Sequence, residues 1–340
     1  MSDQATILRG LVGDRRDAAA ATVAPRTVVE RRTRTPVDCR TLAVTSGKGG
    51  VGKSSLALNL AVALVKMGRK VCLLDANPGL GNIDLMCGLN GYWNLSHVVS
   101  GARTVEEIVL AGPGGIHVVP GGAGLEELTH APADVQVDLL EQLVALEAAH
   151  DDLLIDTGTG LATGTRQFLT VAERVLVVTT PEPTAIADAY ATIKSICGLT
   201  TTPELFVLVN MATDPAIARN VLHRIHETAR SFLQREVREA GYVPLDAAVP
   251  RSIHERCPFA ATQPHAPATR AIEQLARRLL AADSVWGSES AGETAGSSGL
   301  ERGLRIALGR QRPAESFFER WLNAVQSRST GVSTAPRRAG

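Results

Sequence analysis

The chain has 340 residues, of which 44% are hydrophobic and 21% are charged, as in soluble globular proteins. Its 35 basic residues balance its 35 acidic residues, so the average charge does not predict binding to nucleic acid. The five cysteines lack zinc-ligand spacing, and neither a signal peptide nor a bilayer-spanning run is recognisable, so we expect reduced thiols in a cytoplasmic protein.

Composition divides the chain into four regions. A polar arm rich in Ala and Arg (1–38) precedes a continuous globular region (39–282). A Gly/Ser-rich linker (283–300) then leads into a basic C-terminal tail (301–340). Segments of such composition do not bury enough apolar surface to fold alone, so we expect the extensions on both sides of the globular region to be flexible.

Short apolar runs rich in Val, Ile and Leu recur through the globular region. They are too uniformly apolar for half-exposed strands and suit a parallel sheet that is covered on both faces. Helical patterns separate several of them, which predicts an α/β domain with a doubly wound, mostly parallel sheet. The expected strands are 41–46, 70–75, 115–121, 151–157, 174–180 and 204–210, and the clearest helices are 55–68, 137–150 and 185–196.

The first strand leads into a sequence that matches the phosphate-binding pattern G-x-x-x-x-G-K-[ST], and a helical pattern follows it. The glycines let backbone N–H groups wrap the phosphates, Lys53 adds charge at the β- and γ-oxygens, and Ser54 offers its hydroxyl to Mg²⁺. A Gly-rich turn that binds nothing is the alternative. The expected nucleotide loop consists of Gly47, Lys48, Gly49, Gly50, Val51, Gly52, Lys53, Ser54 and Ser55.

The generic loop does not require a second lysine, Lys48. The pattern K-G-G-x-x-K-[ST] resembles the deviant Walker A motif of the MinD/ParA class of P-loop ATPases. That resemblance implies that Lys48 reaches across a dimer interface to the nucleotide of the partner subunit. A cation from each side offsets the repulsion between two phosphate groups, so ATP would join two chains. A solvated loop lysine is the alternative.

Two acidic residues, Asp75 and Asp156, lie at the ends of expected strands, where Walker B acids hold Mg²⁺ or its waters. The glycines that follow Asp156 predict a second switch segment. Residues 73–89 resemble the first switch of MinD-like proteins, which usually carries D-x-D, but Asn77 occupies the second acidic position here. Asn can orient a water but cannot act as a carboxylate base. We therefore expect slow ATP hydrolysis that uses Lys48, Asp75, Asn77 and Asp156, with a non-hydrolysing scaffold as the alternative.

The adenine site is expected at the ends of two later strands. By resemblance to the class, Asn210 bonds the adenine edge, and the segment from Pro244 to Asp246 forms the opposite wall. A turn residue that caps the next helix is an equally weighted alternative for Asn210. The segment after Asn210 lacks the lysine of a guanine-specific N-K-x-D motif, so ATP is favoured over GTP.

Four segments (79–89, 94–122, 153–160 and 177–196) resemble the FlhG family, also called FleN or YlxH. Its members are MinD-like ATPases that regulate flagellar number and placement. The resemblance covers roughly 39–282 and implies a switch that dimerises with ATP. A MinD-type or ParA-type positioning ATPase, for division or DNA segregation, stays open as an alternative.

The arm begins with a sequence, Asp3 to Arg9, that resembles the D-Q-A-x-x-L-R activator motif of this family. The resemblance implies that Asp3, Gln4 and Arg9 stimulate a partner GTPase of the FlhF type, in which Gln4 orients a catalytic water. Apolar residues fall on one face of this short segment, so an amphipathic helix that packs on its own domain is the alternative. Flagellar basal-body proteins and a transcription regulator stay open as further partners.

The tail contains a predicted amphipathic helix (314–328) with arginines nearby. An aromatic apolar face of this kind suits an anionic membrane surface, and two such helices in a dimer bind far better than one. We therefore expect a cytoplasmic protein that associates peripherally with membrane. Docking onto its own domain or onto another protein is the alternative. The face consists of Phe317, Phe318, Trp321, Leu322 and Val325.

Overall fold

The computed structural model describes residues 39–77, 81–160, 163–199, 201, 203–288 and 315–329. The predictions for the arm, including Asp3, Gln4 and Arg9, lie outside these residues, as do those for 289–314. Within the part of the chain that is described, no helix is both long enough and apolar enough to cross a membrane.

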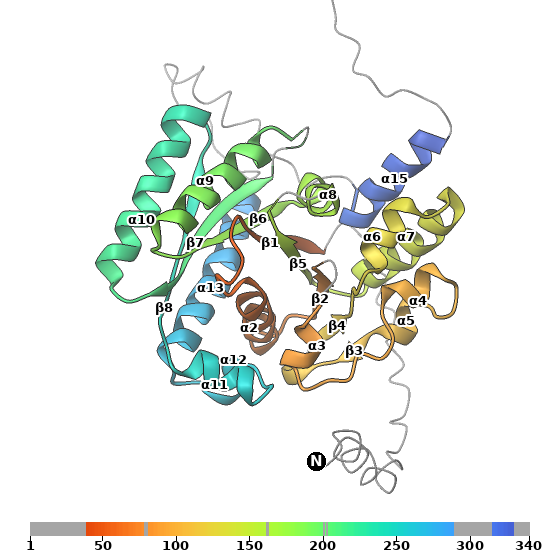
Figure 1. The fold of residues 1–340 in the computed structure, drawn as a ribbon, viewed down its shortest axis with the longest axis horizontal. Coiled ribbons are helices and arrows are strands. Elements are labelled where there is room, and N and C mark those ends of the chain that lie inside the picture. The colour runs from red at the N-terminus through yellow and green to blue at the C-terminus, as the bar shows by residue number, and fades with distance from the viewer. Residues whose placement is uncertain are drawn as a thin grey trace, which may run out of the picture. The chain divides into compact units, whose positions relative to one another are not determined.

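Among the described residues, eight strands form one sheet with helices on both faces (Figure 1). Their order is β3-β4-β2-β5-β1-β6-β7-β8, and within this sheet only the pair β3–β4 is antiparallel. The predicted doubly wound, mostly parallel fold is therefore confirmed. The strands are β1 (Arg40–Ser46), β2 (Val71–Ala76), β3 (Leu110–Ala111), β4 (His117–Val119), β5 (Asp152–Thr159), β6 (Arg174–Thr179), β7 (Glu204–Ala212) and β8 (Val237–Pro244).

The helices fall into two layers, one on each face of the sheet. Strand side chains alternate between the two cores beneath them: Leu153 and Ile155 of β5 join one core, and Leu154 joins the other. The first layer holds α4 (Leu95–Val99), α5 (Val105–Ile108), α6 (Gly124–His130), α7 (Ala133–Ala148), α8 (Thr163–Val171), α9 (Pro183–Cys197), α10 (Pro215–Thr228) and α15 (Phe317–Ser329). The second holds α2 (Lys53–Lys66), α3 (Ile83–Met86), α11 (Ala248–His254), α12 (Phe259–Thr262) and α13 (Pro267–Ser288).

Two short irregular turns complete the described elements. Pro113–Gly115 forms a 3₁₀ turn before β4, and Ala229–Leu233 forms a π turn after α10. Strand β1 lies in the middle of the sheet, between β5 and β6. The chain runs to one side of β1 for β2 and to the other side for β6, so the strand order reverses there. Ligands of open α/β sheets bind beside such a switch point, at the carboxyl ends of the strands.

Several element boundaries differ from the sequence-based predictions. Strands β3 and β8 were not predicted, because β3 has only two residues and the edge strand β8 mixes exposed polar with buried apolar residues. The predicted linker is wrong over 283–288, where α13 continues to Ser288. Helix α13 packs on α2 and β8. Adding residues to a helix that has already formed costs little free energy, because the unfavourable step is nucleation.

The helix predicted at 314–328 begins at Phe317 in the structure. Ser316 and Glu319 form a capping box, in which Ser316 N–H donates to Glu319 Oε2 (2.6 Å) and Glu319 N–H donates to Ser316 Oγ (3.3 Å). This S-x-x-E signal was present in the sequence and gives the start more accurately than the preceding proline.

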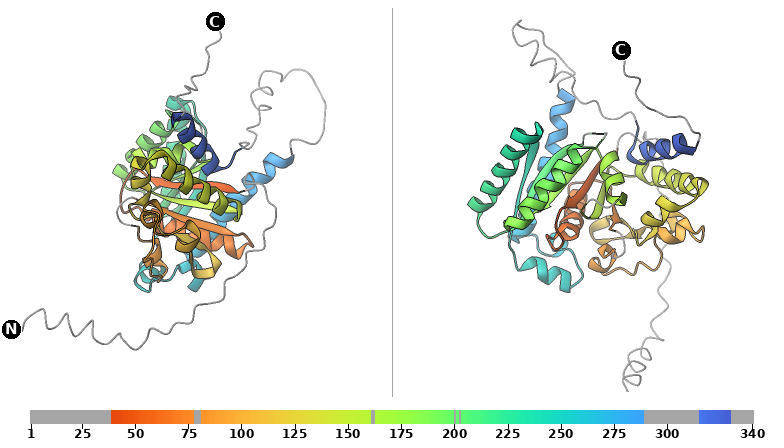
Figure 2. Two further views of the ribbon diagram at one scale, coloured as in Figure 1. Left: turned by 90° about the vertical axis from the view of Figure 1, so that its right-hand side faces the viewer. Right: turned by 45° about the horizontal axis from the view of Figure 1, so that its top comes forward.

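Helix α15 packs against α7 and α8 of its own domain (Figure 2). Phe317 and Phe318 are fully buried, and the Phe317 ring stacks on Phe168 of α8 with ring centroids 6.2 Å apart. Trp321 meets the same Phe168 ring edge-on at 5.2 Å. Of the predicted membrane-binding face, only Leu322 is partly exposed, since Val325 is buried as well. Docking onto the protein's own domain, the alternative left open above, is the arrangement found here.

Candidate nucleotide site

The loop 47–52 joins the buried strand β1 to the N-terminus of α2. Gly50 and Gly52 have φ angles of 79° and 85°, a left-handed conformation that residues with a Cβ rarely adopt. Ser46 Oγ donates to the Lys48 carbonyl at 2.9 Å, and Gly52 O accepts from Leu56 N–H as the first helical bond. The glycines thus bring the chain around so that α2 starts with its free N–H groups at the switch point.

Gly47 is required for a different reason, which is close packing. A Cβ at Gly47 would lie 2.3 Å from the carbonyl oxygen of Asp188 in α9, whereas a Cβ at Gly49 would have no atom within 4 Å. We expect Gly47→Ala to lower the free energy of unfolding by about 1–3 kcal/mol, because either the loop or α9 must shift. Gly49→Ala is the matched control and should leave the free energy of unfolding, measured by chemical denaturation, unchanged. Equal effects of the two variants would contradict this packing argument.

Lys53 and Asp156 form a buried ion pair inside the site. Lys53 Nζ lies 2.7 Å from Asp156 Oδ1, and the two side chains are only 6% and 1% exposed. Burial raises the pKa of Asp156, while the charge and hydrogen bond of Lys53 act in the opposite direction. Asp156 therefore holds the charge of the loop lysine in the interior of the protein.

Asp75 lies beside Asp156, since the two are register partners on the adjacent strands β2 and β5. Burial and the neighbouring charge of Asp156 raise the pKa of Asp75 to about 7, although N–H groups of Ile83 and Asn77, each 3.2 Å away, partly offset this. Two adjacent carboxylates in a buried site repel each other. A cation between them would relieve that repulsion.

The residues present fit a Mg²⁺ ion. Asp156 Oδ2 is buried and has no hydrogen-bond partner among the described residues, so one carboxylate oxygen is free to act as a ligand. The Ser54 hydroxyl lies close enough to lower the pKa of Asp156. Carboxylate and hydroxyl oxygens are the ligands that Mg²⁺ prefers. Ser54, Asp75 and Asp156 could therefore hold Mg²⁺ directly or through its waters, and their role as ligands stays a prediction.

Asn77 follows β2, and its backbone N–H donates to Asp75 Oδ1. It is half-buried next to the two carboxylates, where an amide could orient a water. Residues 78–80, which continue the first predicted switch, lie outside the described residues. In the second predicted switch, β5 extends to Thr159, and Gly160 N–H donates to Ser46 O at 2.9 Å. This segment is thus tied to the nucleotide loop.

Lys48, the second loop lysine, has different partners from Lys53. Its Nζ lies 2.6 Å from Glu182 Oε1 and 2.9 Å from Thr184 Oγ1, both at the start of α9. The lysine side chain is 35% exposed and that of Glu182 56% exposed. The hydrogen bond from Lys48 lowers the pKa of Glu182, so the carboxylate is ionised at neutral pH. The sequence analysis did not single out Glu182 or Thr184.

Asn210 and Asp246 both have structural contacts in this site. Asn210 is buried, and its Nδ2 donates to the Val51 carbonyl of the nucleotide loop at 2.8 Å. Asp246 Oδ1 accepts from Ala248 N–H and Oδ2 from Ala268 N–H, each at 2.9 Å, so its carboxylate caps the starts of α11 and α13. The adenine contacts expected of Asn210 and of the segment after Pro244 remain predictions. What the structure shows is that Asn210 supports the nucleotide loop and that Asp246 caps α11 and α13.

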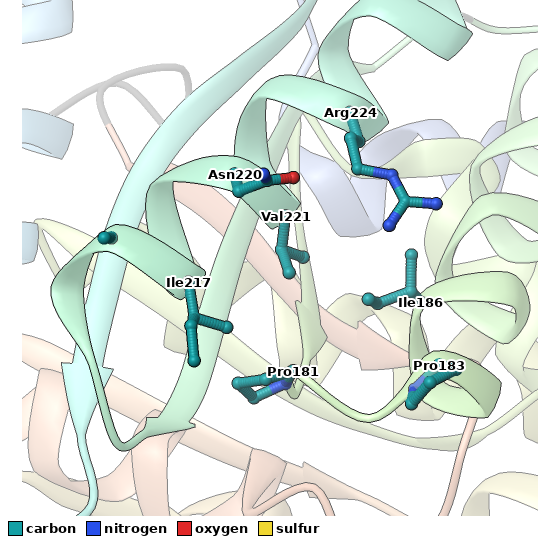
Figure 3. A pocket seen from close by; sticks show the side chains of 8 residues that line it. Pro181, Pro183, Ile186, Ile217, Asn220, Val221 and Arg224 are labelled. Atoms are coloured by element: carbon teal, nitrogen blue, oxygen red, sulfur yellow. The ribbon is translucent and has the colours of Figure 1, made fainter.

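A groove of about 490 Å³ opens next to Glu182, between the start of α9 and α10 (Figure 3). Pro181 and Pro183, which flank Glu182 in the chain, line one side, and Ile217 and Arg224 of α10 line the other. The segment that holds Lys48 is therefore also one wall of this groove.

Comparisons with known proteins agree with this geometry. A family model described as "ParA: NUBPL iron-transfer P-loop NTPase" matches residues 39–280. The chain is 33% identical over 238 residues to the antiactivator FleN of Pseudomonas aeruginosa, across 70% of this chain and 85% of that protein. It is 33% identical over 240 residues to the flagellum site-determining protein YlxH of Helicobacter pylori, across 70% of this chain and 81% of that one.

The fold also resembles solved structures. The MinC:MinD cell division protein complex of Aquifex aeolicus includes a chain that superimposes with a TM-score of 0.60 at 25% identity, covering 72% of this chain and 96% of that one. These similarities cover the sheet and the nucleotide loop described above. The chain therefore belongs to the FlhG (FleN/YlxH) family of MinD/ParA-type, ATP-binding P-loop NTPases.

Proposed function

We propose that this protein is a switch that dimerises when it binds Mg²⁺ and ATP and so regulates flagellar number or placement. The observation that carries the proposal is the position of Lys48. It lies on the nucleotide loop, its side chain is 35% exposed, and its ammonium group is bonded to Glu182 at the start of α9. A lysine in that position can be offered to a nucleotide on a second chain, whereas Lys53 is paired with Asp156 of its own chain.

The chain's own residues account for nucleotide binding and for slow turnover. Lys53 would leave Asp156 for the β- and γ-phosphates, because a phosphate group carries more charge than one carboxylate. Asp156, Asp75 and Ser54 would then hold Mg²⁺, which supplies positive charge at the phosphate oxygens. Asn77, next to Asp75, orients a water but takes no proton from it.

Turnover by Asn77→Asp tests the enzymatic half of the proposal. We expect the wild type to hydrolyse ATP slowly and the variant to hydrolyse it at a similar rate or up to about tenfold faster, because phosphoryl transfer relies more on positioning than on proton abstraction. Steady-state phosphate release with Mg²⁺ and anionic vesicles measures both rates. Hydrolysis by the variant alone would mean that the natural protein is an ATP-bound scaffold.

The tail and the arm carry the proposed outputs of the switch. In the docked state the apolar face of α15 is buried, so it has to leave α7 and α8 before it can enter a membrane. ATP-dependent dimerisation would favour the released state and bring two such helices to one surface, which strengthens binding. The segment from Asp3 to Arg9 would meet a GTPase of the FlhF type. This last step rests on the sequence motif alone.

A further inference from the structure

Helix α3 connects the magnesium-binding acids to a cysteine. Its first residue, Ile83, donates its backbone N–H to Asp75 Oδ2 at 3.2 Å. Cys87 caps the other end, one turn later, and donates its N–H to the carbonyls of Ile83 and Asp84. A constraint placed on Cys87 would therefore act on a helix whose first residue is hydrogen-bonded to Asp75.

Cys87 lies next to the segment that contains a second cysteine. A Cβ at Gly88, the residue after Cys87, would lie 3.1 Å from the carbonyl oxygen of Arg256, the residue before Cys257. The two backbone segments are thus in contact. Burial raises the pKa of the Cys87 thiol to about 12, and the nearby charges of Asp84 and Cys257 contribute. Cys87 is therefore a protonated thiol within electrostatic range of Cys257.

The two cysteines differ in access to solvent. Cys87 is buried, with 7% exposure, whereas Cys257 is half-buried in the turn between α11 and α12. An oxidant from solvent would reach Cys257 first, and Cys87 would be the second thiol to react. This order of access, an accessible thiol beside a buried one, is what a reversible dithiol site needs.

The segment after Cys257 is anchored to the helix that follows the nucleotide loop. Ala260 N–H donates to Asn59 Oδ1 of α2 at 2.8 Å, and Lys66 Nζ donates to the Ala260 carbonyl. The side of the pair that carries Cys257 is therefore fixed to α2. The side that carries Cys87 belongs to α3, a four-residue helix that also contacts α2.

We propose that Cys87 and Cys257 form a reversible disulfide that ties α3 to the α11–α12 turn and restrains the first switch. A hydroperoxide oxidises the Cys257 thiol to the sulfenic acid and releases water or an alcohol. The Cys87 sulfur then attacks that sulfenic sulfur, the S–S bond forms, and the sulfenic oxygen leaves as water with the Cys87 proton. A dithiol such as reduced dithiothreitol or a thioredoxin-like protein reverses the reaction.

The other cysteines supply controls. Cys39 and Cys72 also lie near each other, but both are buried, so no solvent oxidant reaches either one first. Cys197, at the end of α9, is half-buried like Cys257 and serves as the matched exposed thiol. A general sensitivity of exposed thiols would affect Cys197 as much as Cys257.

The first experiment counts and maps thiols in the full-length protein after hydrogen peroxide. The wild type should lose two of its five thiols, and non-reducing peptide mapping should join the peptides of Cys87 and Cys257. In the Cys87→Ser variant, Cys257 should accumulate as a sulfenic acid that dimedone traps. In the Cys257→Ser variant, Cys87 should stay reduced. The Cys197→Ser variant should behave as the wild type. Five retained thiols, or a bond that involves Cys197 or a second chain, would overturn the proposal.

The second experiment measures the consequence, which rests on the proposed ATPase function. Oxidised wild type should lose ATP turnover at least severalfold and recover it with dithiothreitol, whereas Cys257→Ser should be indifferent to peroxide. A disulfide that forms without changing turnover would refute the restraint on the first switch. If the protein hydrolyses no ATP, the proposed ATPase function is wrong, but peptide mapping still decides whether the disulfide forms. Nucleotide affinity, measured with and without the disulfide, then replaces turnover as the test of whether the first switch is restrained.

Discussion

Replacing Lys48 by alanine is expected to abolish ATP-dependent dimerisation while leaving ATP binding by the monomer within about threefold of wild type. The reason is that two loop lysines serve two sites. Lys53 Nζ lies 2.7 Å from the buried Asp156, whereas Lys48 Nζ lies 2.6 Å from the exposed Glu182. Removing Lys48 would leave two phosphate groups facing each other without their compensating cations. Light scattering after gel filtration, with a non-hydrolysable ATP analogue, measures the dimer.

Glu182→Gln is the matched control for this prediction. The amide keeps the shape of the side chain but removes the charge that holds Lys48 in the present position. Because the pair is largely exposed, its removal should change the dimerisation constant by only a few-fold, in the direction of easier dimerisation. A Lys48→Ala protein that dimerises as readily as wild type would refute the role proposed for Lys48.

Glu147→Leu is expected to release α15 and to give vesicle binding without nucleotide. Glu147 is fully buried in α7, and its two carboxylate oxygens accept the N–H groups of Phe317 (2.8 Å) and Phe318 (3.0 Å). Leucine would leave these two N–H groups buried without acceptors, at a cost of about 1–3 kcal/mol each. Protection of α15 against hydrogen exchange should then fall about 30-fold or more, as for a loss of about 2 kcal/mol.

Vesicle co-sedimentation gives the functional readout. Without nucleotide, wild type should stay in the supernatant with anionic phospholipid vesicles, and Glu147→Leu should sediment with them. The double variant Glu147→Leu with Trp321→Glu should return to the supernatant, because a charge on the apolar face opposes insertion. If the released helix shows no affinity for such vesicles, the tail serves protein docking instead, and the membrane part of the proposed function is wrong.

The same carboxylate predicts how docking of α15 depends on pH. Burial raises the pKa of Glu147 from 4.5 to about 7, against the two N–H groups that lower it, while a released Glu147 would titrate near 4.5. The docked state therefore holds a proton that the released state lacks between these values. Docking should be strongest below pH 4.5, weaken by up to about 3 kcal/mol as the pH rises to 7, and change little above.

The Glu147→Gln variant separates the pH dependence of α15 docking that comes from Glu147 from that of other titrating groups. The amide oxygen still accepts a hydrogen bond from α15, but the side chain has no proton to exchange. Exchange protection of α15 in this variant should lose the part of its pH dependence that lies between 4.5 and 7. An unchanged profile would rule out Glu147 as the source of that dependence.

The amino-acid sequence by itself determined the fold class, the nucleotide loop and the two acids at the strand ends. These depend on local patterns: uniformly apolar runs predict strands of a covered parallel sheet, and the spacing of glycine, lysine and serine predicts a phosphate loop. The carboxyl ends of parallel strands share one edge, so Asp75 and Asp156 were expected together and are register partners in the structure. The capping signal at Ser316 was equally local and would have corrected the start of α15.

Only the tertiary structure decided which distant residues bind Lys48 and the N-terminus of α15. Lys48 meets Glu182, 134 residues away, and the N-terminus of α15 meets Glu147, 170 residues away. No periodicity encodes such pairs, because each one depends on where two elements come to lie after the sheet has formed. An apolar helix face fits a membrane and a groove on its own domain equally well. The buried carboxylate of Glu147, which accepts the first N–H groups of α15, favours the groove in this state.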